Sequence, residues 1–243
     1  MSERTWRLLD LFCGAGGSAM GYHRAGFTVT GVDHLPQPHY PFAFVQADAL
    51  EYVAQHGREY DAIHASPPCQ HYSALKHLVR REHGMLVEAT HSALRATARP
   101  YVIENVVGAP LDTILMLCGS MFGLETPCGA QLRRHRLFES NLLLLSPGEC
   151  LHGLSTIGIV GHALRYETLR MARRRTISVK GRNFEGGNGT SSHEYFSVQD
   201  ARCAMGINWM NSNELSQAIP PAYTAWIGKQ LRTALLQRGT PYA

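Results

Sequence analysis

The sequence lacks the features that would place the protein in a membrane or outside the cell. No apolar run among its 243 residues approaches the length of a membrane span, and its first residues do not have the layout of a secretory signal peptide. The six cysteines are scattered and do not form the spacing of a disulfide framework. These absences predict a reduced, cytoplasmic protein without a membrane partner.

Charged residues are also scarce, because Asp, Glu, Lys and Arg make up only 17% of the chain and the formal net charge is +4. This low charge argues against a disordered tail, and it requires a local basic patch if the partner is a nucleic acid. The sequence has no internal repeats. Hydrophobic residues reach 44%, which is enough for the core of one large α/β domain.

The first 110 residues alternate between strand-like and helix-like stretches. We predict strands over 6–12, 28–32, 42–46, 60–65 and 101–103, with helices over 17–25, 49–56 and 85–98. This alternation predicts a doubly wound, mainly parallel sheet, in which ligands bind at the carboxyl ends of the strands. Helical patterning fades near residue 141 and returns from residue 198 and over 221–237.

A glycine-rich turn follows the first predicted strand, in the stretch Asp10–Gly17. Glycines let the backbone approach a ligand closely, although an ordinary strand–helix turn has the same composition. Asp33 and Asp48 then end the second and third predicted strands. A carboxylate in the first position can accept ribose hydroxyls, and one in the second can accept an adenine amino group. Taken in register, the three features favour an adenosyl cofactor.

Cys69 ends the most specific local pattern, Ser66-Pro67-Pro68-Cys69-Gln70, which follows the fourth predicted strand. Two prolines stiffen the turn, so the thiol would be held in place for attack as a nucleophile. Most cysteines are instead small buried hydrophobic residues, and we expect that role for Cys13, Cys118 and Cys203.

Two further motifs contain ionisable side chains. Glu104 ends the fifth predicted strand, where a partly buried carboxyl can keep a proton and pass it to a ring nitrogen. A helix-capping or salt-bridged acid is the alternative. Arg134 and Arg136 lie on one face of an extended segment that begins at Gln131. They could grip a base or a phosphate, or they could form a solvated basic face.

Together these stretches resemble the DNA (cytosine-5) methyltransferase family, in a small or phage-type form. The matching stretches are DLFCGAGG, GVD, QADAL, SPPCQHYS, YVIENV and QLRRHRLF, which occur in the family's order over most of residues 8–140. Two later stretches, 197–205 and 217–221, look like the family's last motifs.

The resemblance implies a Rossmann-like methyltransferase fold, S-adenosylmethionine as the cofactor and double-stranded DNA as the partner. It implies methyl transfer to C5 of a flipped-out cytosine through a covalent bond from Cys69 to C6. The catalytic residues implied are Cys69, Glu104, Arg134 and Arg136. The cofactor-binding residues implied are Asp10, Phe12, Gly14, Gly16, Asp33, Asp48, Ala49, Pro67 and Gln217.

The resemblance also implies a division of the chain into a catalytic domain over 1–140, a small target-recognition lobe over 141–195 and C-terminal helices over 196–243. The lobe is rich in arginine, which predicts contact with DNA, although a solvated loop would have the same composition. The expected DNA-binding residues are Gln70, Ser73, Arg80, Arg81, Arg173, Arg174 and Arg175. We expect a monomer without an obligatory protein partner, acting as a stand-alone or phage-encoded modification enzyme.

The sequence departs from the family in three places. Two residues instead of one separate Gln131 from Arg134, and the pair Ser216-Gln217 stands where the family has Gly-Asn. The recognition lobe is also short. Two alternatives stay open: the tRNA-directed branch of the family, whose Cys-Phe-Thr signature is not matched by the stretch after Cys69, and a non-catalytic adenosyl-binding or DNA-binding module.

A zinc site is a further alternative near the start of the lobe. Cys128, Cys150 and His152 lie in this part of the sequence, and Cys118 lies upstream. No Cys-x-x-Cys spacing occurs among them, so the sequence predicts no metal site.

Overall fold

The computed structural model describes residues 5–68, 84–112, 114–152, 155–158, 175–178 and 197–239. The main strands and helices follow in chain order: β1 (Trp6–Leu11), α1 (Gly17–Arg24), β2 (Phe27–Asp33), β3 (Ala43–Gln46), α2 (Ala49–His56), β4 (Ala62–Ala65), α3 (Gly84–Thr97), β5 (Tyr101–Asn105), β6 (Leu115–Leu117), β7 (Gln131–Leu132), β8 (Arg136–Ser140), β9 (Ser155–Gly158), β10 (Arg175–Ser178), α4 (Val198–Met205), α5 (Ser212–Gln217) and α6 (Pro221–Gly239). Two short 3-10 helices, η1 (Gly57–Glu59) and η2 (Gly119–Phe122), complete the order.

Seven strands form one sheet in the order β3-β2-β1-β4-β5-β8-β6. Strands β1 to β5 run parallel to one another, and β8 runs antiparallel to both β5 and β6. The predicted doubly wound, mainly parallel sheet is therefore confirmed. Because β1, β2, β4 and β5 point the same way, their carboxyl ends lie along one edge of the sheet, where a ligand is expected.

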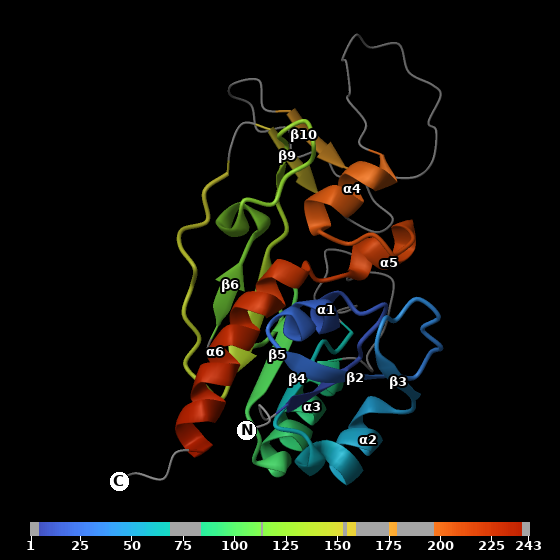
Figure 1. The fold of residues 1–243 in the computed structure, drawn as a ribbon, viewed down its shortest axis with the longest axis vertical. Coiled ribbons are helices and arrows are strands. Elements are labelled where there is room, and N and C mark those ends of the chain that lie inside the picture. Colours follow the sequence, from blue (N-terminus) through green and yellow to red (C-terminus); the bar gives the residue numbers. More distant parts are fainter. Residues whose placement is uncertain are drawn as a thin grey trace.

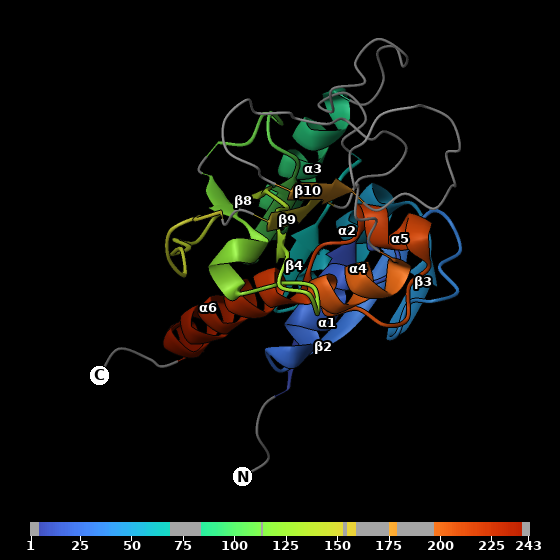
Figure 2. The same ribbon diagram turned by 90° about the horizontal axis from the view of Figure 1, so that it is seen from above.

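Alternating side chains of the central strands pack on opposite faces of this sheet. Leu8 packs with Tyr22 of α1 and Ile227 of α6, whereas Leu9 packs with Val53 of α2 and residues of α3. Seen from above, α1 and α6 lie on one side of β4 and α3 lies on the other (Figure 2). The sheet is therefore covered by helices on both faces.

A second, three-stranded sheet has the order β10-β9-β7 and parallel pairing. It lies beside α4, above the main sheet in Figure 1. Leu132 of β7 is fully buried against Met205 and Leu215, which come from the α4–α5 region. The small sheet thus joins two strands of the expected lobe to a strand that precedes residue 141.

Most predicted elements agree with the structure within one or two residues. The fourth strand begins at Ala62 instead of residue 60, because the 3-10 helix η1 ends in front of it at Glu59. The strands of the small sheet were not predicted, since each has only two to four residues. Among the helices described here, none is long and apolar enough to cross a membrane.

Candidate active site

The glycine-rich turn after β1 has an unusual backbone. Gly14 and Gly16 have φ angles of 48° and 84°, and Phe12 has a φ of 55°, a left-handed value that non-glycine residues seldom adopt. Such a conformation costs on the order of 1 kcal/mol and is concentrated at functional sites. At Gly16 a Cβ atom would lie 2.8 Å from Pro41 Cδ, so this position requires glycine.

Asp33, the last residue of β2, holds this turn in place. Its Oδ2 accepts a hydrogen bond from the Gly14 backbone N–H at 3.1 Å, and its Oδ1 accepts one from the Leu35 N–H at 3.0 Å. Each carboxylate oxygen can accept a further bond, so the group can still take hydroxyl donors from a ligand. The carboxyl end of β2 therefore combines an acceptor with a turn whose backbone is open to a ligand.

The other two predicted cofactor acids lie in different surroundings. Asp48 is exposed and is the N-cap of α2, where its Oδ1 accepts from the N–H groups of Leu50 and Glu51. The next residue, Ala49, is buried. Asp10 is fully buried, and both its oxygens accept from Ser18 Oγ at 3.0–3.1 Å. These hydrogen bonds tie the first turn of α1 to the end of β1 inside the core, where burial raises the pKa of Asp10 well above its ordinary value.

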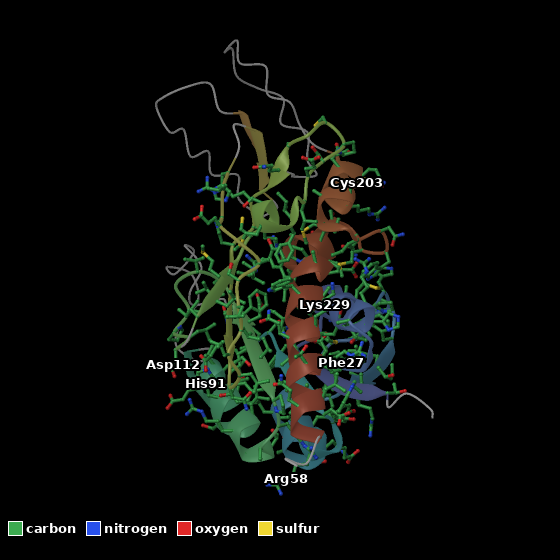
Figure 3. The ribbon with its side chains drawn as sticks, turned by 60° about the vertical axis from the view of Figure 1, so that its left-hand side comes forward. Phe27, Arg58, His91, Asp112, Cys203 and Lys229 are labelled. Carbon is green, nitrogen blue, oxygen red and sulfur yellow. The ribbon has the colours of Figure 1, made fainter. Side chains whose placement is uncertain are left out.

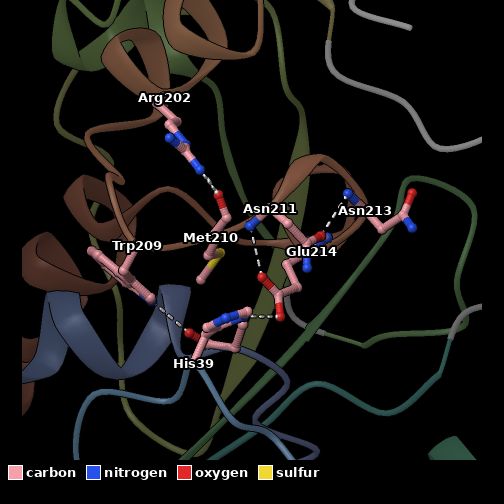
Figure 4. A network of polar contacts seen from close by, with 8 residues as sticks. His39, Arg202, Trp209, Met210, Asn211, Asn213 and Glu214 are labelled. Carbon is pink, nitrogen blue, oxygen red and sulfur yellow. Dashed lines mark hydrogen bonds and ion pairs between the residues drawn. The ribbon is translucent and has the colours of Figure 1, made fainter. Parts of the chain in front are cut away.

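The C-terminal segment packs onto the same turn. The Trp209 indole N–H donates to the backbone oxygen of Ala15 at 2.8 Å, and Glu214 of α5 contacts His39 at 2.8 Å (Figure 4). A Cβ atom at Gly17 would lie 2.5 Å from the carbonyl oxygen of Ile219. Gln217, at the end of α5, is exposed. The segment between α4 and α6 therefore forms a rim around the glycine-rich turn.

Glu104 lies near the end of β5 and is 6% exposed. Its Oε1 pairs with Arg136 Nε at 3.0 Å. Burial raises the pKa of Glu104, and the charges of Arg136 and Arg134 and a hydrogen bond with Ser66 oppose that rise. The carboxyl is thus fixed in orientation and keeps its proton to a higher pH than an exposed glutamate does.

A buried hydrogen-bonded chain leads from α1 to this carboxyl. The Tyr22 hydroxyl lies 3.0 Å from His64 Nδ1, and His64 Nε2 lies 2.9 Å from Ser66 Oγ, which in turn bonds to Glu104. Burial lowers the pKa of His64 to about 3, so the ring is neutral and offers one donor and one acceptor. Sequence reasoning missed His64 and Tyr22; the only signal was a polar residue inside an apolar strand.

The turn after β4 is fastened to both neighbouring strands. Asn105 of β5 donates from Nδ2 to the carbonyl oxygen of Pro67 at 3.1 Å, and the Ser66 N–H donates to the Leu11 oxygen of β1 at 3.2 Å. The next predicted site residues lie outside the described part of the chain: Cys69, Gln70, Ser73, Arg80, Arg81, Arg173 and Arg174. Arg175 is the first residue of β10.

The structure gives different surroundings to the three arginines of the segment that leads into β8. Arg133 is exposed, whereas Arg134 is 4% exposed and Arg136 faces Glu104. Arg134 donates from Nη2 to the Ser216 carbonyl at 2.8 Å, and its own carbonyl accepts from the Tyr223 hydroxyl at 2.6 Å. The pair favoured from the sequence, Arg134 and Arg136, is therefore the pair that points inward.

The comparisons with known proteins find matches among solved structures. No family model and no curated protein matches the chain. An Escherichia coli prophage protein described as a DNA modification methyltransferase matches 96% of this chain and 100% of its own, with 14% identity and a TM-score of 0.58. The Dnmt2 methyltransferase of S. pombe matches 96% of this chain and 99% of its own, with 13% identity and a TM-score of 0.60.

The methyltransferase EhMeth of Entamoeba histolytica is also similar, with 11% identity and a TM-score of 0.54 over 96% of this chain and 99% of its own. At identities this low, a likeness establishes the fold alone. The strand order, with one antiparallel strand between β5 and β6, agrees with that result. The chain therefore has the fold of the C5-methyltransferase structures of the DNA and Dnmt2 kinds.

Proposed function

We propose that this protein transfers a methyl group from S-adenosylmethionine to C5 of cytosine in double-stranded DNA. The observation that supports the proposal best is the buried Glu104 carboxyl, whose pKa is raised by burial and whose position is fixed by Ser66 and Arg136. It lies beside the turn that Asn105 holds and that leads directly to Cys69. A nucleophile and a proton-holding acid at neighbouring strand ends suit addition to a cytosine ring.

In this mechanism the Cys69 thiolate forms a bond to C6 of a cytosine that has left the base stack, since C6 and C5 are out of reach in the duplex. The ring electrons move toward C5 while Glu104 donates its proton to N3. S-adenosylmethionine, when bound, supplies C5 with an electrophilic methyl group. The thioether S-adenosylhomocysteine would be the leaving group of that transfer. A solvent water would then take the C5 proton as the Cys69 thiolate departs from C6. Glu104 would take its proton back from N3, so the aromatic ring, the nucleophile and the acid would all be restored.

Arg136 and Ser66 act on Glu104 before and during that step. Arg136 pairs with one carboxyl oxygen, and the hydrogen bond with Ser66 links the carboxyl to the neutral ring of His64. Both contacts restrict the rotation of the side chain, which keeps the acidic proton directed at one place. Arg134 ties the same segment to the C-terminal rim through Ser216.

The residues at the ends of β1 and β2 fit an adenosyl group. A Cβ atom at Gly14 would meet nothing within 4 Å, so the backbone there is open to a ligand. Asp33 would accept the ribose hydroxyls, and Asp48 would accept the adenine amino group with the oxygen that its capping bonds do not use. Phe12, at its left-handed position, would contact the cofactor from the turn.

DNA as the substrate is supported by the sequence. The stretch after Cys69, Gln70-His71-Tyr72-Ser73, lacks the Cys-Phe-Thr signature of the tRNA-directed branch. In this proposal residues 1–140 form the catalytic domain, 141–195 the target-recognition lobe and 196–243 the returning helices. Arginines of the lobe would contact phosphates and base edges.

Covalent trapping tests the proposal. With S-adenosylmethionine and a duplex that contains 5-fluorocytosine, the wild type should form a stable protein–DNA adduct, because fluorine at C5 cannot leave as a proton. Cys69→Ser should form none, since a hydroxyl is a far poorer nucleophile than a thiolate near neutral pH. The matched control is Cys203→Ser, which should trap like the wild type. The expectation that Cys203 is buried was wrong, since this residue of α4 is exposed. An adduct in Cys69→Ser would overturn the assignment.

A further inference from the structure

Four side chains from three distant parts of the chain meet at one point beside β8. They are Cys118, His135, Cys150 and His152, and their sulfur and ring nitrogen atoms all lie within 4.8 Å of one another. The His152 Nε2 atom lies 3.3 Å from the sulfur of Cys118 and also 3.3 Å from that of Cys150. The His135 Nε2 atom lies 3.3 Å from the Cys150 sulfur.

Hydrogen bonding alone does not account for this arrangement. A ring nitrogen has either one proton or one in-plane lone pair, so His152 Nε2 can serve only one of the two thiols that converge on it. The two imidazole rings lie with their centroids 5.1 Å apart and their planes at 71°, and both direct nitrogen atoms at the same sulfur. The sulfur and nitrogen atoms are therefore arranged around one common point and do not form separate hydrogen-bonded pairs.

We propose that these four residues bind a structural zinc ion. Two thiolates and two imidazoles form one of the ligand sets that zinc takes in closed, four-coordinate sites. Zinc–sulfur bonds of about 2.3 Å and zinc–nitrogen bonds of about 2.0 Å place neighbouring tetrahedral ligands about 3.5 Å apart. The three sulfur–nitrogen separations of 3.3 Å in the structure are close to that value. Two thiolates would also neutralise the ion's charge, so burial of the centre is tolerated.

The position of the site indicates what the ion would hold together. Cys118 directly follows β6 and is fully buried, and His135 lies between Arg134 and Arg136 at the start of β8. Cys150 and His152 belong to the yellow connection that runs from β8 toward β9 at the left of Figure 1. A zinc ion would therefore fasten the arginine segment and the approach to the small sheet to the edge of the main sheet.

This site differs from the grouping considered from the sequence. Cys128, a member of that grouping, is exposed and contacts Thr126, and His135 takes its place in the cluster. A second group, of His91, Asp112 and Glu139, is less suited to an ion. His91 and Asp112 of this group are labelled in Figure 3. The Asp112 side chain is 76% exposed, and Glu139 Oε2 already accepts the Asp112 N–H at 2.8 Å.

Metal analysis of the purified full-length chain tests the proposal without any activity assay. We expect about one zinc ion per chain after dialysis, as in other closed Cys2His2 sites. Cobalt added to chelator-stripped, reduced protein should give the intense absorption of tetrahedral cobalt with thiolate ligands. Removal of the ion should lower Tm, and added zinc should restore it.

Variants identify the ligands. Cys150→Ser and His152→Ala should lose the ion, whereas His152→Cys should keep it, because three cysteines and one histidine also bind zinc. Cys128→Ser and Cys203→Ser are matched controls that should retain wild-type stoichiometry. If Cys150→Ser does not fold, the two variants His152→Ala and His152→Cys, together with the cobalt spectrum of the wild type, decide the outcome. Any one of three results would overturn the proposal. The first is that reduced wild type takes up neither zinc nor cobalt, and the second is a Cys118–Cys150 disulfide in the native protein. The third is equal metal uptake by His152→Ala and the wild type.

Discussion

The two ends of the candidate site hold their carboxylates in opposite ways. At the acid end, Glu104 is buried between an arginine and a hydrogen-bonded serine, and burial raises its pKa. At the cofactor end, Asp33 and Asp48 accept hydrogen bonds from backbone N–H groups, and Asp48 is exposed. Backbone N–H donors stabilise a charged carboxylate. This difference is what the proposed function requires, in which the first end holds a proton and the second binds hydroxyl and amino groups.

The strongest test of this contrast is Glu104→Gln. An amide can still donate a hydrogen bond but cannot transfer a proton, so we expect kcat to fall by about 10²–10⁴-fold. Affinity for S-adenosylhomocysteine should stay within about twofold, because Glu104 is not at the cofactor end. Single-turnover kinetics and calorimetric titration measure the two quantities. Glu59→Gln, at an exposed acid, is the control. A parallel loss of cofactor affinity would show that the two ends are not separate.

The buried chain behind Glu104 predicts a pH dependence of stability. His64 titrates near pH 6.5 in the unfolded chain and near 3 in the folded protein, so the unfolded state binds the extra proton between these values. The neutral ring therefore makes its full contribution to the free energy of unfolding above pH 6.5. As the pH falls from 6.5 toward 3, that free energy decreases by on the order of 4 kcal/mol. Urea unfolding over this range should show a shallower dependence for His64→Gln. An unchanged dependence would place the histidine outside the network described here.

At the cofactor end, Asp33→Ala and Asp48→Ala should weaken S-adenosylhomocysteine binding by roughly tenfold to a hundredfold. A hydrogen bond to a charged group contributes about 1.5–3 kcal/mol. DNA affinity should not change in either variant. Asp112→Asn, at a carboxyl whose side chain is 76% exposed, is the matched control for calorimetry. Wild-type affinity in both alanine variants would mean that the nucleotide pocket lies elsewhere.

The smallest expected effects concern the arginines of the proposed recognition lobe. We expect at least one of Arg173→Ala, Arg174→Ala and Arg175→Ala to lower affinity for all DNA sequences. The same variant should reduce the slope of log affinity against log salt concentration by about one unit. An arginine that contacts a base edge should instead cost about 1–3 kcal/mol and relax one position of the target site. Fluorescence anisotropy at several salt concentrations distinguishes these two kinds of loss. If all three variants behave like the wild type, recognition must lie near Arg80 and Arg81.

Much of the main sheet could be predicted from the sequence, because each strand or helix has a local signal. The run of residues 49–56 has helical spacing and an N-cap in Asp48, and its predicted bounds match α2. Glu104 and Asp33 could be found in the same way, since each ends an apolar strand. The carboxyl ends of parallel strands lie along one edge of the sheet, so local predictions were enough to place both residues at that edge.

The small sheet and the two buried clusters could not be predicted in that way. Strand β7 has two residues and pairs with β9 across a long stretch of chain, and neither strand alternates clearly. The link between Tyr22 and His64 joins a helix to a strand far along the sequence. The ligands of the proposed zinc site come from three separate stretches of the chain, and only Cys150 and His152 are close in sequence, so no Cys-x-x-Cys motif marks them. Tertiary packing alone brings these groups together.

Release of tritium from cytosine labelled at C5 tests the central claim most directly. With S-adenosylmethionine and duplex DNA, the wild type should release tritium catalytically, and Cys69→Ser and Glu104→Gln should release little or none. A matched tRNA substrate should give no release. Tritium release from tRNA but not from DNA would contradict the proposed substrate, and an absence of release from both would contradict the assignment of a cytosine-5 methyltransferase.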